Sequence, residues 1–549
     1  EERFLRGVQR NIRTRVLAGL YTNLKMIFVA GYSRTLRVGE LYERELYSEV
    51  EDGDDGKSPV TGPRWLRWLP AWFARLCGLK REDRWLAKLQ IHPKGDGGVR
   101  DEGFRPRDDN WRRTNKAPIL ILNATTLNTG HTWQFTTSYM GEPPAPINAK
   151  VDCNYRLRRV YYKDVPRKFS PVRLGHAVAA SSCVPGLFEP LILDDLYPDG
   201  DGKRRISVRL VDGGVCDNQG IGSLLEQDCT VMLVSDGSGQ MDAEDIPSAG
   251  LLGVPLRSNS ILQARVREAQ YGDIASRRSS DVLRGLMFVH LKQDLESAAL
   301  AWRDCPPELK ESDFEKDLSA GAKGVTTYGV ASDTQMRLAA VRTDLDSFCD
   351  AEAYALMASA YRMTARQFRG KEPCIAGFDA DARKETWRFN EIAEALTPRG
   401  GKREQLNKLL TASSNVPFKI WKLWTPLIIL KWALVAGLVA GIVWLFYSRW
   451  GAELLPQSVY EWAHANLTFK SVATFVGWTV FFAIVAAAVN AVVGVARGKY
   501  VLRAIHWRET LKDIAIGIGM SVAGFAVARL HLHVFDKLYL WYGGMKRFK

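Results

Sequence analysis

The chain has 549 residues, of which 46% are hydrophobic and 25% are charged, and this composition excludes a disordered, collagen-like or disulfide-scaffold protein. The net charge of +14 is concentrated in residues 402–549, which hold 18 basic and 6 acidic residues, a net of +12. The nearly neutral remainder argues against a nucleic-acid partner, and the basic end, with nine of the 17 tryptophans, favours a membrane.

Near its start the chain reads as helical over 10–50 and then breaks at the polar stretch 51–63. In the stretch 64–76, Trp and Phe side chains alternate with arginines. This pattern is typical of a helix that lies in a lipid headgroup layer. A surface helix whose aromatic side chains pack on the body has the same pattern, so both interpretations stay open.

Four apolar runs in the body are typical of β-strands. Several lack polar alternation, which indicates burial on both faces and therefore a parallel sheet. Helical patterns, such as the one at 260–266, separate them, and the chain turns helical again from Asp344. We predict a layered α/β domain with a mainly parallel sheet. The four runs lie at 118–123, 208–212, 231–235 and 287–291.

A polar linker at 396–416 leads into a predicted membrane anchor over 417–549. The apolar runs 424–447 and 471–496 are long enough to span a hydrocarbon core of about 30 Å. The third, 514–535, is either a marginal span or a partly inserted helix, because Arg529 and two histidines interrupt it. The small residues of the second run favour homo-oligomers.

Basic residues cluster before the first run and in the loop 497–513, whereas the loop 448–470 carries few. The positive-inside rule then places the body and the loop 497–513 in the cytoplasm. We therefore expect an integral membrane protein whose body lies on the cytoplasmic side. The eight cysteines form no C-x-x-C pair, which agrees with a reducing compartment.

The strand at 208–212 delivers Asp212 directly onto Gly213 and Gly214. At the carboxyl end of a parallel strand, such a carboxylate points into the crevice where these sheets bind ligands. The glycines allow a tight turn and the close approach of another group. Asp217 and Asn218 follow, and their side chains are suited to holding the turn by hydrogen bonds to the backbone.

Two further stretches accompany this turn. The first, 123–130, follows a strand and reads Asn-Ala-Thr-Thr-Leu-Asn-Thr-Gly. The second, 174–190, reads as a small-residue helix stopped by proline and packed closely against a neighbour. In this order and spacing the three stretches resemble the patatin-like phospholipase family. The resemblance covers about 123–237 and extends more loosely through 342–348, as in the larger bacterial members.

The resemblance implies a three-layer patatin-like domain over 1–395, with 51–117 as an insertion. It also implies a serine acyl hydrolase with a Ser–Asp dyad, in which Asp212 is the base and Gly213, Gly214 and Asn218 support the motif. A serine hydroxyl needs such a base to become a nucleophile. Backbone N–H groups of a glycine-rich loop then stabilise the oxyanion.

The nucleophile of the family lies on a G-x-S-x-G turn, which this sequence lacks. The nearest match is Gly31-Tyr32-Ser33-Arg34-Thr35, where Thr35 replaces the second glycine. A β-branched residue is poorly suited to that strained turn. We expect the nucleophile and its oxyanion loop upstream of Glu1, with Ser33 as the alternative. We also predict that the chain by itself lacks acyl-hydrolase activity.

Other reactive side chains carry weaker signals. The histidines form no H-x-x-x-H or H-E-x-x-H pattern, so we expect no metal and no other cofactor. His531 and His533 are more simply read as interfacial side chains beside Arg529 than as ligands. Cys216 has no base adjacent in sequence, and we interpret it as an inert thiol.

Two functions follow from these patterns. The first is a membrane-anchored lipid acyl hydrolase of the phospholipase A or lysophospholipase type, which serves lipid degradation and takes a phospholipid or another acyl lipid as substrate. The alternative is a catalytically inactive patatin-like module that binds lipid or acts as a scaffold on the anchor. The first needs a nucleophilic serine within reach of Asp212, and the second does not.

Overall fold

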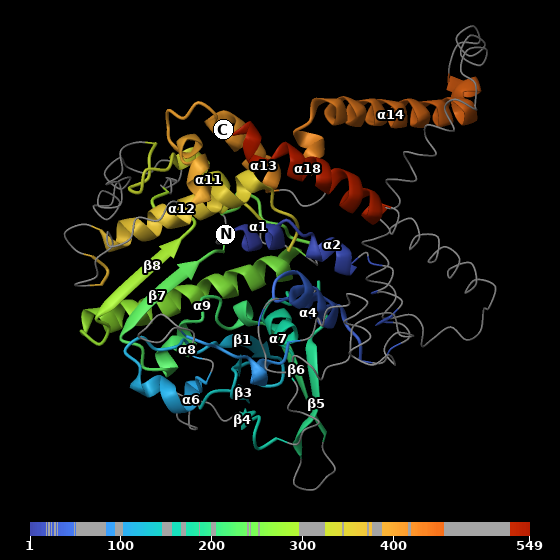
Figure 1. Ribbon diagram of the computed structural model, residues 1–549. Helices are drawn as coiled ribbons and strands as arrows, with labels where there is room; N and C mark the ends of the chain where they lie inside the picture. The colour runs from blue at the N-terminus through green and yellow to red at the C-terminus, as the bar shows by residue number, and fades with distance from the viewer. Residues whose placement is uncertain are drawn as a thin grey trace, which may run out of the picture.

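A computed structural model describes most of the chain (Figure 1). Two predictions fall outside the described residues. They are the interfacial helix at 64–76 and the membrane span at 471–496. Apart from short gaps, the described residues are 1–50, 84–144, 156–295, 324–454 and 527–548.

Six short strands form one sheet in which every pairing is antiparallel. The strand order is β4-β3-β2-β1-β6-β5. A short connection joins β1 to β2 and turns at Gly130, whose φ is +75°, and such a hairpin joins antiparallel neighbours. The strands are β1 (Leu122–Thr126), β2 (Thr132–Phe135), β3 (Tyr139–Gly141), β4 (Val160–Tyr161), β5 (Leu191–Pro198) and β6 (Arg205–Asp212).

The prediction of a three-layer domain with a mainly parallel sheet is therefore wrong. That prediction rested on apolar runs, and β6 shows that such a run also occurs in an antiparallel sheet. Val208 and Leu210 belong to one apolar cluster, whereas Val211 belongs to a different one. Because successive side chains of a strand point to opposite faces, Val211 is buried on the face opposite to Val208 and Leu210, whereas Arg209 on the Val211 face is exposed.

A separate pair of strands, β7 (Val231–Asp236) and β8 (Gly285–His290), is parallel. The helix α9 (Gly253–Ser279) connects them, as a parallel pair requires. Together with α8 (Ile221–Glu226), α9 supplies the apolar cover of one face of the pair. The buried cluster between these helices and the strands includes Ile221, Met232, Val234, Ile274 and Leu286.

The helices α4 (Arg34–Glu45) and α7 (Leu174–Ser181) pack closely against each other. The contact depends on two glycines, because a Cβ on Gly39 would lie 2.8 Å from the backbone oxygen of Gly175. Beside the glycines, buried Glu43 accepts the Gly175 N–H at 3.0 Å and pairs with Arg173. The closely packed small-residue helix expected within 174–190 is thus confirmed.

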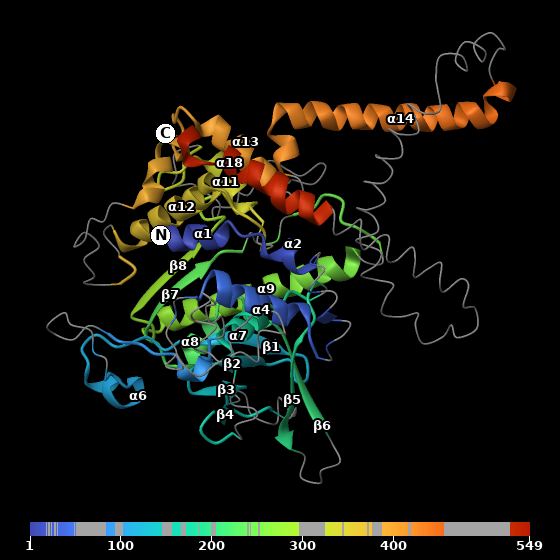
Figure 2. The same ribbon diagram turned by 45° about the vertical axis from the view of Figure 1, so that its right-hand side comes forward.

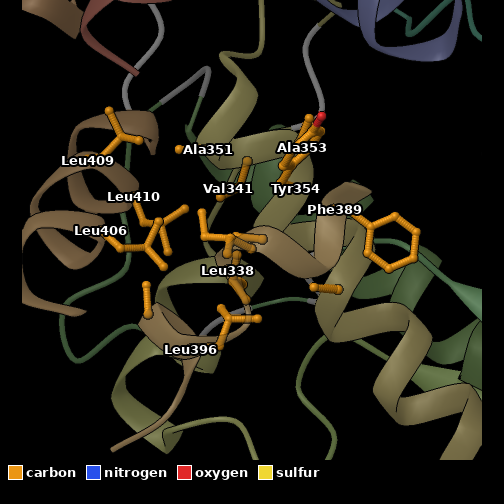
Figure 3. Packing of buried hydrophobic residues seen from close by; sticks show 14 of the residues in the cluster. Leu338, Val341, Ala351, Ala353, Tyr354, Phe389, Leu396, Leu406, Leu409 and Leu410 are labelled. Atoms are coloured by element: carbon orange, nitrogen blue, oxygen red, sulfur yellow. The ribbon is translucent and has the colours of Figure 1, made fainter. Parts of the chain in front are cut away.

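A helical layer holds a large apolar cluster, in which Leu406 and Leu410 point toward Leu338 (Figure 3). In both ribbon views this layer lies on one side of β7 and β8, and the six-stranded sheet lies on the other (Figures 1 and 2). One of its helices occupies much of 396–416, the segment that composition assigned to a linker. The helices are α11 (Ser332–Ala339), α12 (Asp350–Phe368) and α13 (Arg403–Ser413).

The helix α14 (Thr425–Leu454) extends away from the body (Figures 1 and 2). Among the residues that the structure describes, no helix has the combination of length and apolarity that crossing a membrane requires. This finding contradicts the prediction of an integral membrane protein with a cytoplasmic body. The start of the apolar run 424–447 belongs to the body. Leu427, and Ile420 just before the run, are buried in the cluster of the helical layer.

The last described residues, 527–548, pack against the body. Two consecutive helices form here, the π-helical turn η10 (His531–Phe535) and α18 (Asp536–Tyr542). Tyr539 is only 1% exposed, and the ring centroid of Phe535 lies 5.3 Å from that of Trp421. The described end of the segment predicted as a third span, 514–535, therefore contributes to the protein core.

Candidate functional site

Asp212 is the last residue of β6 and precedes the 3-10 helix η4 (Gly213–Val215). Its backbone is held on both sides. The Asp212 N–H donates to the carbonyl oxygen of Cys183 at 3.3 Å, and the Asp212 carbonyl oxygen accepts from Thr125 Oγ1 at 2.9 Å. The carboxylate Oδ1 accepts the Gly214 N–H at 2.8 Å. The position of this side chain is therefore fixed by three neighbouring segments.

The two glycines after Asp212 are needed for close packing. A Cβ on Gly213 would lie 2.5 Å from the backbone oxygen of Asn123, which is too close for any side chain. A Cβ on Gly214 would lie 2.7 Å from Asn218 Oδ1 and 3.1 Å from Asp212 Oδ1. The prediction that these glycines permit close approach of another group is confirmed.

The second acidic residue of the motif, Asp217, serves the backbone. Its carboxylate accepts the N–H groups of Gly220 at 2.8 Å, Ile221 at 3.2 Å and Gly222 at 2.8 Å. These donors belong to the first turn of α8, where backbone N–H groups have no helical partner. Asp217 therefore caps α8, in line with the prediction that it bonds to the backbone.

Burial raises the pKa of the half-buried Asp212 carboxyl, and the Gly214 N–H acts in the opposite direction. The negative charge of Asp212 affects the pKa values of two ionisable neighbours. Burial raises the pKa of Tyr42 to about 12 and that of Cys183 to about 12, and the negative charge of Asp212 adds to both effects. At neutral pH, Tyr42 and Cys183 are therefore uncharged. Among the described residues, the Asp212 carboxylate therefore lies near two side chains that are neutral at this pH.

Sequence reasoning missed the neighbours of Asp212 that come from α4 and from the end of α7. The Tyr42 hydroxyl lies 3.2 Å from Ser182 Oγ, and Ser182 precedes Cys183, which binds the Asp212 N–H. Ser182 and Cys183 lie within the stretch 174–190, one of the three that resemble the patatin-like family. Tyr42 lies far away in sequence and carried no signal of its own.

The stretch 123–130 supports the turn from the side of β1. The Asn123 side-chain oxygen accepts the Ser223 hydroxyl at 2.9 Å, which ties β1 to α8. Asn128 brackets β6, because its Nδ2 donates to the Ser207 carbonyl and its Oδ1 accepts the Arg209 N–H, both at 2.9 Å. These asparagines therefore position β6, which carries Asp212.

Ser33, the alternative nucleophile, is the N-cap of α4. Its Oγ accepts the Leu36 N–H at 3.3 Å. The adjacent Arg34 forms an ion pair with Glu189, with 2.9 Å between Nη1 and Oε1. The described residues include no contact between Ser33 and Asp212, so the structure assigns Ser33 a capping role and does not bring it to the site.

The remaining candidates are held by local partners. Cys216 Sγ accepts from Thr132 Oγ1 at 3.3 Å. His531 Nε2 lies 3.5 Å from Asp536 Oδ1, and His533 Nε2 lies 3.0 Å from Arg529. Among the described residues, no group of three or more His, Cys, Asp or Glu side chains is arranged to hold a metal ion.

Comparisons with known proteins assign no family to this chain. No protein-family model, no curated protein and no solved structure matches it.

Proposed function

We propose that this chain carries the aspartate base of a Ser–Asp acyl hydrolase. The observation that carries the proposal is the Asp212 carboxylate, which is half-buried, has a raised pKa and, among the described residues, accepts a hydrogen bond at Oδ1 only. Among the described residues no basic side chain pairs with it. A carboxylate that is neither neutralised by a cation nor fully solvated is a stronger proton acceptor than an ordinary aspartate.

In this proposal Asp212 Oδ2 takes the proton of a serine hydroxyl while the serine oxygen attacks the carbonyl carbon of an ester. The alcohol leaves with the proton, and an acyl-enzyme remains. A water molecule then attacks the acyl carbon while Asp212 takes its proton; the bond to the serine oxygen breaks, the proton passes to that oxygen, and the fatty acid is released. Among the described residues no serine hydrogen-bonds to the Asp212 carboxylate, and Gly214 is its only hydrogen-bond donor there.

The substrate class in this proposal is a phospholipid or another acyl lipid. It follows from the resemblance of 123–130, 174–190 and the Asp212 turn to patatin-like phospholipases. The surroundings of Asp212 are compatible with ester chemistry, because Tyr42 and Cys183 stay protonated at neutral pH and do not compete as anionic nucleophiles.

The test measures hydrolysis of a chromogenic acyl ester and of phospholipid in mixed micelles by the full-length gene product. We expect Asp212→Asn to lower kcat by about 10⁴-fold, the size of the loss when the aspartate of a serine hydrolase is replaced. Asp228→Asn is the matched control, because Asp228 is exposed and its φ of +50° suits asparagine.

Near wild-type turnover by Asp212→Asn contradicts the proposal. Lipid binding by a wild-type protein that hydrolyses neither substrate also contradicts it, and supports instead an inactive lipid-binding or scaffolding module.

A further inference from the structure

A cluster of buried charges surrounds the loop 345–349 in the helical layer. Asp346 Oδ2 accepts from Arg342 Nε at 2.6 Å and lies 3.0 Å from Lys419 Nζ. The three side chains are 5% exposed or less. Such charges are stable in a protein interior only when each has a well-placed partner, so the loop has a single favoured position.

The same charged groups also hold the loop backbone. Lys419 Nζ donates to the carbonyl oxygen of Ser347 at 2.7 Å, and Arg342 donates to the same oxygen at 3.2 Å. The Cys349 N–H donates to Glu352 Oε2 at 2.8 Å. Side chains from three separate segments therefore determine the path of a few backbone atoms.

Leu345 stands at the start of this loop in an unusual conformation. Its φ is +58°, in the left-handed region that branched side chains rarely adopt. The Arg13 N–H donates to its carbonyl oxygen at 2.9 Å. Conformations of this kind persist only where the surrounding structure enforces them, and they occur often at functional sites.

The Leu345 side chain packs against the apolar cluster next to Asp212. The cluster includes Tyr42, Cys183 and Val211. Val211 directly precedes Asp212, and the Cys183 carbonyl oxygen binds the Asp212 N–H. Leu345 therefore lies directly before the buried charges of the helical layer in the chain and packs against the cluster that Val211 and Cys183 share.

We propose that Leu345, held in place by the Arg342–Asp346–Lys419 cluster, is a positioning residue for Asp212. The loop holds an apolar side chain against the support of the catalytic turn, so that the turn keeps its geometry and water stays out of the cluster. The catalytic consequence rests on the proposed function, whereas the positioning itself does not.

The experiment compares Leu345→Asn with Leu345→Met in the full-length gene product. Asparagine tolerates a left-handed backbone but removes the apolar contact, and methionine retains the contact. We expect Leu345→Asn to lower kcat by about ten- to hundredfold with KM nearly unchanged, because small misplacements of a catalytic group have effects of this size. Leu345→Met should restore kcat.

Alkylation of Cys183, followed by mass spectrometry of its peptide, measures how well the cluster around Cys183 stays closed, and it needs no turnover. We expect the rate to rise at least about tenfold in Leu345→Asn, since a buried thiol reacts only when its surroundings open. The control is Leu406→Ala, which removes a fully buried side chain from the other cluster. It should lower the melting temperature without changing the alkylation rate.

If Leu345→Asn lowers only the melting temperature, and Cys183 reacts as slowly as in Leu406→Ala, the positioning role is refuted. If the wild type hydrolyses no ester, the proposed function fails separately, and the alkylation rates still decide whether Leu345 positions the turn.

Discussion

Asp212 and Asp346 are two poorly solvated aspartates with opposite surroundings. The Asp346 carboxylate faces Arg342 and Lys419, and its side chain is 1% exposed. The Asp212 carboxylate receives one backbone N–H and no cation among the described residues, and burial raises its pKa. The first arrangement stabilises a charge and uses it for structure. The second leaves a carboxylate ready to take a proton.

The difference shows how one residue type acquires two roles in one fold. A buried charge that faces two cations stabilises the fold only while both cations remain. The Asp212 carboxylate lies at the end of a strand, and among the described residues a glycine turn holds it through one oxygen only. The following predictions test this contrast, from the largest expected effect to the smallest.

Removal of one cation from Asp346 should have the largest effect on stability. We expect Lys419→Met to lower the free energy of unfolding by about 3–5 kcal/mol, because it leaves part of a buried charge uncompensated. Urea denaturation measures this loss. Lys431→Met, at an exposed lysine on α14, should change stability by no more than about 0.5 kcal/mol. Equal effects of the two substitutions would show that the buried cluster is not structural.

Gly213→Ala tests the close packing behind Asp212. The new Cβ would lie 2.5 Å from the backbone oxygen of Asn123, so the turn must shift. We expect a loss of about 1–3 kcal/mol in unfolding free energy, together with a drop in ester turnover. Gly237→Ala is the matched control, because its Cβ would meet no atom within 4 Å. A Gly213→Ala protein with unchanged stability and turnover would refute the tight turn.

Asp217→Ala tests the assignment of the second aspartate of the motif to a helix cap. Loss of three N–H contacts at the start of α8 should lower the unfolding free energy by about 1 kcal/mol. Asp245→Ala, at an exposed position, should leave it unchanged. Melting temperatures of the two variants, measured side by side, check the difference.

Asp212→Asn and Asp346→Asn should change stability in opposite directions at pH 7. The pKa of Asp212 is raised in the folded protein, so folding favours its protonated form and the charged form opposes folding above that pKa. Asparagine removes this charge, and we expect a gain of less than about 1 kcal/mol. In Asp346→Asn two buried cations lose their partner, so stability should fall. A loss of stability in both variants would contradict the proposed difference between Asp212 and Asp346.

The sequence predicted the local features of the site better than the topology around it. The strand that ends at Asp212, the need for two glycines and the backbone role of Asp217 all depend on residues within one short segment. The orientation of the strands depends on which segments pair, and apolar residues such as Val208, Leu210 and Val211 do not reveal whether that pairing is parallel or antiparallel. For β1 and β2, the short hairpin that turns at Gly130 makes the pairing antiparallel.

Long-range contacts account for the features that the sequence did not predict. Tyr42 and Leu345 reach the surroundings of Asp212 from positions far away in the chain, and neither has a local motif that marks it. Hydropathy alone also could not show that Ile420, Leu427 and Tyr539 belong to the core of the body, because a buried helix and an apolar exposed one have the same composition.

The pH dependence of kcat/KM for ester hydrolysis by the full-length gene product tests the role of Asp212 most directly. The base acts when it is deprotonated, so activity should fall as the pH drops through the Asp212 pKa, and this acid limb should lie above the ordinary aspartate value of about 3.9. The Asp212→Asn protein should lack the activity whose pH dependence shows this acid limb. An acid limb that persists unchanged in active Asp212→Asn protein would contradict the account.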